Sequence, residues 1–272
     1  MEFVTERNDI VNMEVDVVVL PANRKLRIGT GASKALFEAA GREQLEAECA
    51  IQLEKAKDKG ISLVPGVCVP THAFDLPAKV ILHTIVPKWR PKEERKCYEE
   101  LCQSYAAALV MADEMGMESI AFPVLAAGNN GFDADIAIEI ALKSLEQYEP
   151  KNKLAQACLV TFEAEITQKV RDLGFTVEEH IDQMHVLDQD MQQAAWWQEE
   201  KKRRRQEKEK DKPAVQVAID QGIEWLQDPE FLIKMAVSAI SVAEMVLPKE
   251  GWGAQARKVL EVVKPFITGG HK

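Results

Sequence analysis

Two glycine-containing loops carry the residue types in this sequence that could bind an anion. The first runs from Pro21-Ala22-Asn23 to Gly29-Thr30-Gly31, and the second is the segment LAAGNNGF from Leu125 to Phe132. Each loop leads into a predicted helix, where backbone N–H groups and the helix N-terminus favour a negatively charged ligand. Two such loops facing each other could hold a diphosphate. Neither loop contains GxGxxG or GxxxxGKS/T, which excludes a dinucleotide-binding Rossmann loop and a P-loop.

The elements that must position these loops alternate between strand and helix up to about residue 176. The patterns predict strands at 15–20, 67–71, 79–85, 119–125 and 157–162, and helices at 32–40, 44–59, 96–115, 133–148 and 165–173. A short strand at 1–6 could add an edge. This alternation predicts an α/β fold, with a largely parallel sheet and helices on both faces. Ligands of such sheets bind at the carboxyl ends of the strands, where both loops lie.

Three segments of the chain, in order and at compatible spacing, resemble the macrodomain family, also called the Appr-1''-p processing family. The stretch from Asn8 to Gly41 resembles its opening turn, strand, glycine loop and helix. LPAKVILHTIVPKW resembles its next characteristic strand, and SIAFPVLAAGNNGF its phosphate-binding strand and loop. The resemblance covers residues 1–176. It implies a three-layer α/β/α sandwich around a mostly parallel mixed sheet that binds ADP-ribose.

The resemblance also implies a role for individual residues. Asp9 matches the acid that accepts a hydrogen bond from the adenine amino group, Ile10 lies beside the base, and Asn23 holds the distal ribose. Without the resemblance, the residues favour a turn or cap role for Asp9. They leave Asn23 open between a ligand contact and ordinary turn chemistry after Pro21. The expected loop residues are Gly29 and Gly31 in the first loop, and Ala127, Gly128, Asn129, Asn130, Gly131 and Phe132 around the diphosphate and distal ribose.

Five positions depart from the family pattern. Asn130 stands where many members have an aromatic residue, Ala126-Ala127 where they have Ser-Thr, and Val86 where they have Gly. Ser33 occupies the position of the acid found in the hydrolase branch. Backbone amides can still bind a diphosphate, but catalysis lacks its usual carboxylate. We therefore expect a protein that recognises free or protein-linked ADP-ribose. An ADP-ribosyl hydrolase, with Asn23 as its catalytic candidate, is the alternative.

Composition changes after Thr176. We predict a charged helical linker at 177–212, which contains the run EEKKRRRQEKEKDK, and a helical C-terminal region at 213–272. The apolar stretch Phe231–Leu247 should be buried against neighbouring helices or a second subunit. This region supports a third hypothesis, a homo-oligomer or partner-binding protein that the ligand regulates.

Charge and composition exclude several further classes. The net charge of −10 makes the chain a poor general binder of nucleic acid, although a local patch could still bind. The five cysteines form no CxxC pair, so we expect reduced thiols, no metal site and no cofactor. Glu2, Glu6 and Arg7 interrupt any secretory signal, and Phe231–Leu247 is shorter than the roughly 20 residues that a spanning helix needs. We expect a cytoplasmic protein with no membrane partner.

Overall fold

In a computed structural model of the protein, the described residues are 1–181. The strands are β1 (Glu2–Arg7), β2 (Val17–Ala22), β3 (Cys68–His72), β4 (Val80–Ile85), β5 (Ser119–Pro123), β6 (Gln156–Thr161) and β7 (Glu178–Glu179). The helices are α1 (Ala32–Ala39), α2 (Arg42–Asp58), α3 (Glu94–Glu114), α4 (Ala134–Glu146) and α5 (Ala164–Asp172), with a 3-10 helix η1 (Ile10–Asn12). The helical C-terminal region predicted at 213–272 lies outside the described residues, as does most of the linker predicted at 177–212.

The strands form one sheet in the order β3-β4-β2-β5-β6-β1-β7. Every neighbouring pair is parallel except β3 and β4, so the predicted mostly parallel, mixed sheet is confirmed. Strand β2 continues through Pro21, where the sequence predicted its end. Pro21 lies beyond Val17 and Val18, the two residues that pair with β5, so the ladder on that side ends before the proline.

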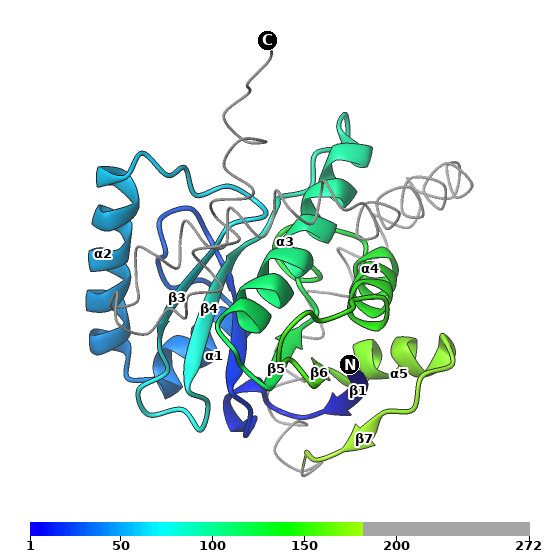
Figure 1. The fold of residues 1–272 in the computed structure, drawn as a ribbon. Helices are drawn as coiled ribbons and strands as arrows, with labels where there is room; N and C mark the ends of the chain where they lie inside the picture. Colours follow the sequence, from blue (N-terminus) through cyan, green and yellow to red (C-terminus); the bar gives the residue numbers. More distant parts are fainter. Residues whose placement is uncertain (182–272) are drawn as a thin grey trace.

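Helices cover the two faces of this sheet (Figure 1). Helices α3 and α4 pack together on one face, and α5 continues that layer beside α4. Helix α1 packs against β2 on the opposite face, in contact with both α2 and η1. The arrangement confirms the three-layer sandwich. Among residues 1–181, no helix has the length and apolar content needed to cross a membrane.

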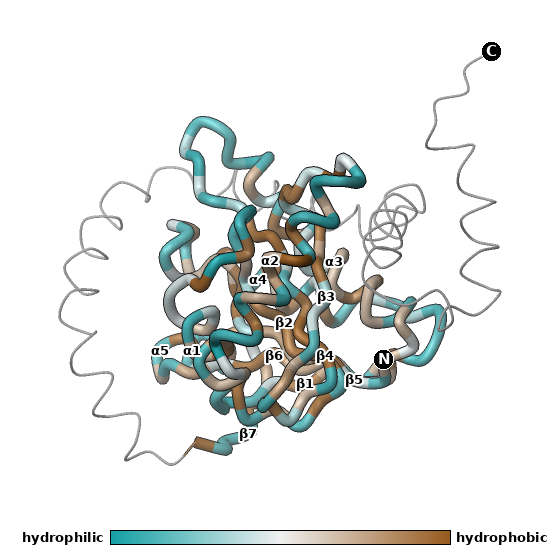
Figure 2. Tube along the Cα trace, turned by 90° about the vertical axis from the view of Figure 1, so that its left-hand side faces the viewer, coloured by the Kyte–Doolittle hydropathy of each residue, from teal (hydrophilic) through white to brown (hydrophobic). Residues whose placement is uncertain are grey.

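The central strands are buried on both faces, which explains their continuous apolar sequence. The side chains from Val17 to Leu20 in β2 are at most 1% exposed. Helix α3 packs against both the sheet and α4, and its small residues Ala106, Ala107 and Ala108 are almost fully buried. Figure 2 shows the apolar strands inside and the hydrophilic segments around them.

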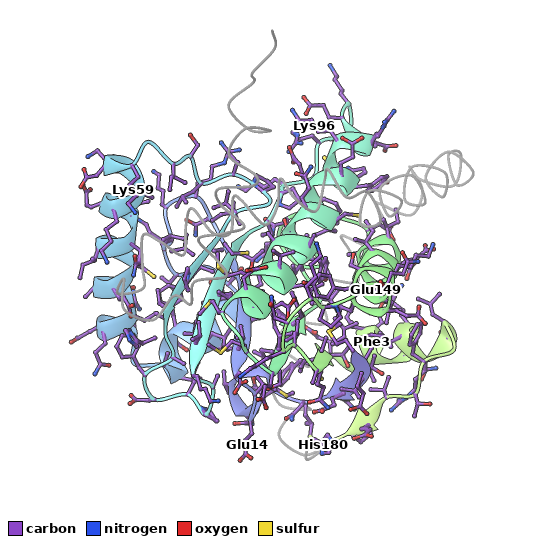
Figure 3. The ribbon with its side chains drawn as sticks, viewed as in Figure 1. Phe3, Glu14, Lys59, Lys96, Glu149 and His180 are labelled. Carbon is purple, nitrogen blue, oxygen red and sulfur yellow. The ribbon has the colours of Figure 1, made fainter. Side chains whose placement is uncertain are left out.

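The C-terminal end of the sheet differs from the sequence prediction in two ways. Residues Glu178 and Glu179 form β7, although helical spacing was predicted from Glu178 onwards, and β7 pairs with β1. Strand β1 is therefore not the edge strand that we expected. The Arg7 guanidinium lies 3.6 Å from the Glu179 carboxylate, and the N–H of His180, which follows β7 (Figure 3), donates to the Arg7 carbonyl. The sheet thus extends beyond the predicted boundary at residue 176.

His83 is a buried core residue on β4, as its position in a predicted strand suggested. Its side chain is fully buried, and Nε2 lies 2.9 Å from Thr71 Oγ1 and 3.7 Å from Cys49 Sγ. Burial lowers the pKa of His83 to about 3. The imidazole is therefore neutral in the folded protein at physiological pH, while in the unfolded chain it titrates near its ordinary value of 6.5.

This difference predicts a loss of stability in mild acid. Between pH 6.5 and about 3 the unfolded chain binds a proton at His83 that the folded protein does not bind, so stability falls as the pH falls. From pH 7 to pH 5, wild type should lose about 2 kcal/mol more of its free energy of unfolding than His83→Gln. Urea denaturation at both pH values measures this, and parallel pH profiles for the two proteins would contradict it.

Candidate functional site

The predicted binding residues lie on loops that leave the sheet at one edge. Strand β1 leads to Asn8-Asp9, β2 to the loop 23–31, and β5 to the loop 124–133. Because these strands are parallel, their carboxyl ends meet at the same edge. Strand β4, which is parallel to β2, brings the segment 86–93 to the same place.

Asp9 is an N-cap whose carboxylate keeps one oxygen for another partner. Its Oδ1 accepts a hydrogen bond from the Val11 N–H at 3.2 Å, and its side chain is partly exposed. Among the described residues, no donor to Oδ2 is found. Ile10, the next residue, is 5% exposed and belongs to the core. Asp9 therefore acts as the helix cap that the residues alone suggested, and within the described region its Oδ2 is left without a protein donor.

Asn23 organises the start of the first loop. Its Nδ2 donates to the Arg27 carbonyl at 2.6 Å, and its Oδ1 accepts from the Lys25 N–H at 3.0 Å. Leu26 takes a left-handed φ of 49° and is buried, which anchors the turn. Asn23 therefore shapes the turn after Pro21, one of the two roles that the residues alone left open. The exposed amide remains able to offer its second Nδ2 hydrogen to a ligand.

The two glycines of the first loop serve different purposes. Gly31 is the N-cap of α1 with φ 58° and ψ −135°, a conformation that only glycine adopts readily. Gly29 donates its N–H to Ser33 Oγ at 3.1 Å, and a Cβ at residue 29 would lie 3.1 Å from the same oxygen. Ser33 is 4% exposed. The hydroxyl therefore holds the loop against the first turn of α1.

The second loop is fixed at both ends by aromatic residues. The Leu125 N–H donates to Tyr105 Oη on α3 at 2.8 Å, and both residues are fully buried. Phe132 is buried against Trp89, with ring centroids 5.3 Å apart. Between these anchors Ala126 has a φ of 64°, a strained conformation for a residue other than glycine. Phe132 therefore anchors the loop and does not present its ring on the surface.

The two loops meet at their tips. Asn129 Nδ2 donates to Thr30 Oγ1, which joins the second loop to the first. The Asn130 carbonyl accepts the Trp89 N–H at 2.8 Å, which joins the second loop to the segment after β4. The structure thus brings together the two loops that the sequence predicted to face each other.

The other predicted residues of the second loop lie close to this contact. Ala127 and Gly128 lie between the anchored Leu125 and Asn129. Gly131 closes the loop by donating its N–H to the Gly128 carbonyl at 3.3 Å.

Sequence reasoning missed Thr30, Trp89 and Tyr105 as positioning residues. Thr30 stands between the two glycines, and a hydroxyl at the tip of a loop was a usable signal. Trp89 closes the motif LPAKVILHTIVPKW, so its position was visible but its contact was not. Tyr105 lies among small apolar residues of α3, and nothing local indicates that its hydroxyl reaches Leu125, 20 residues away.

Neither loop offers a carboxylate to a ligand. The segments 23–34 and 124–132 contain no Asp or Glu. The next acid, Asp133, caps α4 by accepting the Asp135 N–H at 3.1 Å. The loops therefore present amides, hydroxyls, backbone N–H groups and the exposed cations Arg24, Lys25 and Arg27, which suits an anionic ligand better than proton transfer.

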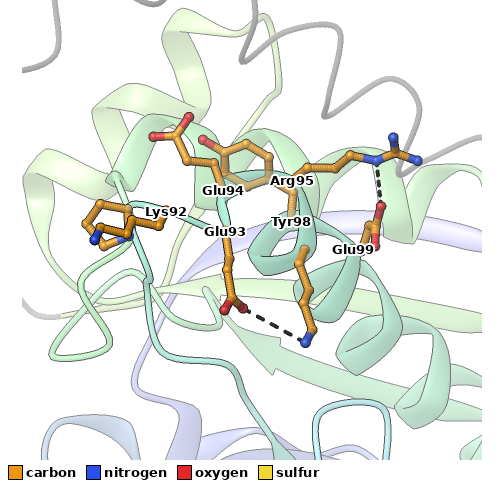
Figure 4. A pocket seen from close by; sticks show the side chains of 8 residues that line it. Lys92, Glu93, Glu94, Arg95, Tyr98 and Glu99 are labelled. Carbon is orange, nitrogen blue, oxygen red and sulfur yellow. Dashed lines mark hydrogen bonds and ion pairs between the residues drawn. The ribbon is translucent and has the colours of Figure 1, made fainter.

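Two other features of the described residues lie apart from these loops. A surface hollow of about 650 Å³ lies at the start of α3, and Figure 4 shows its Arg95–Glu99 and Lys96–Glu93 ion pairs. None of the predicted binding residues lines it. The second feature is the group Glu6, Glu178 and His180, whose ligand atoms lie within 4.8 Å of one another. Exposed acidic groups of this kind are common without a metal, so we assign no ion to it.

The fold and the loops define an α/β protein with two glycine loops joined at one edge of the sheet, and comparison with known proteins identifies its family. The family model described as Macro domain matches residues 19–141 of this chain. An O-acetyl-ADP-ribose deacetylase of Escherichia fergusonii is 35% identical over 150 residues, which are 55% of this chain and 81% of the relative. A macro domain-containing protein of Xanthomonas axonopodis pv. citri is 31% identical over 173 residues, or 64% of this chain and 94% of the relative. The chain belongs to the macro domain family.

Solved structures agree with this assignment. The Oceanobacillus iheyensis macrodomain with ADP has a TM-score of 0.56 and 29% identity, covering 61% of this chain and 86% of that chain. A mutant of the same macrodomain with ADPR has a TM-score of 0.56 and 28% identity, covering 62% of this chain and 89% of that chain. The resemblance stated from the sequence is therefore confirmed for the N-terminal region.

The conformation of Gly31 predicts a backbone effect that a matched variant can isolate. A Cβ at either Gly31 or Gly128 would have no atom within 4 Å, but only Gly31 has a positive φ. Gly31→Ala should lower the free energy of unfolding by about 1–3 kcal/mol through strain. Gly128→Ala should change it little. Urea denaturation of the two variants measures the difference, and equal stabilities would refute the strain.

Proposed function

We propose that residues 1–181 form a module that binds ADP-ribose, free or linked to a protein. The observation that carries the proposal is the joining of the two carboxylate-free glycine loops at one sheet edge, through Thr30 and Asn129. Such loops offer several backbone N–H groups to a diphosphate. The structures of the Oceanobacillus iheyensis macrodomain with ADP and with ADPR support this ligand class.

In this proposal the ligand extends along the sheet edge from Asp9 to the first loop. Asp9 holds the adenine, because an ionised carboxylate accepts strongly from an amino group, and Ile10 lies beside the base. Gly29, Gly31 and the segment Ala127–Phe132 surround the diphosphate and the distal ribose. Asn23 contacts the distal ribose through its exposed amide.

A second candidate function is hydrolysis in the same site. The relative of Escherichia fergusonii that bears the name O-acetyl-ADP-ribose deacetylase favours it. The absence of an acid in either loop argues against it, since general base assistance contributes roughly 10²–10⁴-fold to such rates. Ser33 cannot replace the acid, because its hydroxyl is buried and already accepts the Gly29 N–H.

The remaining hypotheses from the sequence stay proposals. A regulated oligomer or partner-binding element would require the C-terminal region 213–272, which lies outside the described residues. A cytoplasmic location, and a role without a metal or cofactor, are likewise expectations that follow from composition.

The adenine position of Asp9 predicts a selective loss of affinity. Asp9→Asn keeps an oxygen that can cap η1 but replaces the other carboxylate oxygen with an amide donor, which cannot accept from adenine. ADP-ribose affinity should fall by about 1.5–3 kcal/mol, the range for hydrogen bonds to charged groups. Calorimetric titration measures this, with ADP-ribose binding more tightly than AMP in wild type.

A matched control is Asp58→Asn at the exposed end of α2, which removes the same charge outside the site. It should bind ADP-ribose as wild type does. Unchanged affinity in Asp9→Asn, or an equal loss in Asp58→Asn, would contradict the placement of the base.

The lack of a loop carboxylate predicts a binder with little or no hydrolase activity. The assay is release of ADP-ribose from mono-ADP-ribosylated protein carrying Glu/Asp, Ser or Arg links, and of acetate from O-acetyl-ADP-ribose. Ser33→Asp places a carboxylate in the first turn of α1, where the helix dipole favours it, and should raise any residual rate by about 10²-fold. Multiple turnovers by wild type that are lost in Asn23→Ala would establish the enzyme instead.

A further inference from the structure

Two arginines of the described region stand out because they lack a carboxylate partner. The arginines at 7, 42, 90, 95 and 171 each form an ion pair with a glutamate. Among residues 1–181, only Arg24 and Arg27 do not, and Lys25 between them also lacks an ion pair. All three side chains are exposed. We call Arg24, Lys25 and Arg27 the basic loop.

The turn that carries the basic loop has a defined shape. Asn23 bonds the backbone of both Lys25 and Arg27, and Leu26 turns inward, where it is 2% exposed. The buried leucine and the bonded asparagine thus fix the backbone on which the three cations are carried. A fixed backbone reduces the entropy lost when these cations meet a partner.

The basic loop lies next to the proposed distal end of the ligand. It follows Asn23 directly and precedes Gly29 by one residue, so it is part of the loop assigned to the distal ribose. A protein attached to that ribose would emerge from the site next to these cations. This step rests on the proposed function, because it requires ADP-ribose to bind with its distal ribose at Asn23.

We propose that the basic loop is a docking surface for an acidic polypeptide segment around an ADP-ribosylated residue. Guanidinium groups bind carboxylates in a bidentate manner, which favours a carboxylate-rich partner close to the attachment point. The module then distinguishes modified proteins by the residues that flank the modification, in addition to the ADP-ribose itself.

The charge of the chain favours a short acidic peptide over a nucleic acid. The net charge is −10, so beyond the basic loop the surface repels a polyanion. At physiological salt, charges interact over about 8–10 Å, and the four residues 24–27 span at most about 14 Å. A loop of this length can contact two or three carboxylates of a peptide. A duplex carries a charge every ~1.7 Å along its whole length, so most of its charges would lie beyond the basic loop.

The test compares two short peptides with one ADP-ribosylated serine each. In one peptide the flanking residues are glutamates, and in the other they are glutamines. Wild type should bind the glutamate peptide about three- to tenfold more tightly at low salt, and high salt should reduce the preference. The double variant Arg24→Gln/Arg27→Gln should bind the two peptides equally. The readout is the ratio of the two affinities, which is independent of any change in ADP-ribose affinity because both peptides carry the same ADP-ribose.

The matched control is Lys151→Gln/Lys153→Gln, which removes two positive charges from the exposed segment before β6, at the opposite edge of the sheet. This control should keep the preference of wild type. Equal loss in both double variants would show a general effect of net charge and would overturn the docking surface.

Other outcomes are equally decisive. Equal binding of the two peptides, with free ADP-ribose still bound, refutes the docking surface and leaves the proposed function intact. Tighter binding of an ADP-ribosylated oligonucleotide than of the glutamate peptide shows that the partner class is wrong. Failure of free ADP-ribose to bind removes the proposed function and this inference together.

Discussion

The parallel pairing of β1, β2, β4, β5 and β6 is the constraint on which the candidate site depends. Parallel strands end at the same edge, so segments far apart in the sequence are placed side by side without contacts of their own. The Asn129–Thr30 hydrogen bond, between residues 99 apart, exists because β2 and β5 are neighbours. A different strand order would leave each glycine loop as an isolated turn.

The core then fixes how precisely the loops are held. Tyr105 reaches from α3 to the first N–H of the second loop, and Phe132 ties the other end into the aromatic group with Trp89 and Tyr98. The strained Ala126 lies between these anchors. A strained backbone persists only where its surroundings hold it, and this one lies in the loop to which the proposed function assigns the diphosphate.

The fold and the candidate residues could be predicted from the sequence because their signals are local. Buried strands such as β2 are continuous apolar runs, and the glycine loops are visible as motifs. The long-range contacts could not be predicted in this way. The two residues of the strand at Glu178–Glu179 have no apolar pattern. Only their pairing with β1 defines them as a strand. Likewise, the hydrogen bond between the Tyr105 hydroxyl and Leu125 depends on neighbours that are distant in the sequence. The same holds for the lack of a carboxylate partner of Arg24 and Arg27 within residues 1–181.

An acid at position 33 could fill two roles, and Ser33 fills only one of them. A carboxylate there would accept the Gly29 N–H and could also take a proton from water. The Ser33 hydroxyl performs the first role, since it accepts that N–H at 3.1 Å while buried beneath the loop. It cannot perform the second, because a hydroxyl without a neighbouring base does not remove a proton at neutral pH. In the proposed function, the loop therefore keeps its shape with a serine at this position but lacks the carboxylate on which hydrolysis would rely. This is why a binding function is consistent with a family whose relatives include deacetylases.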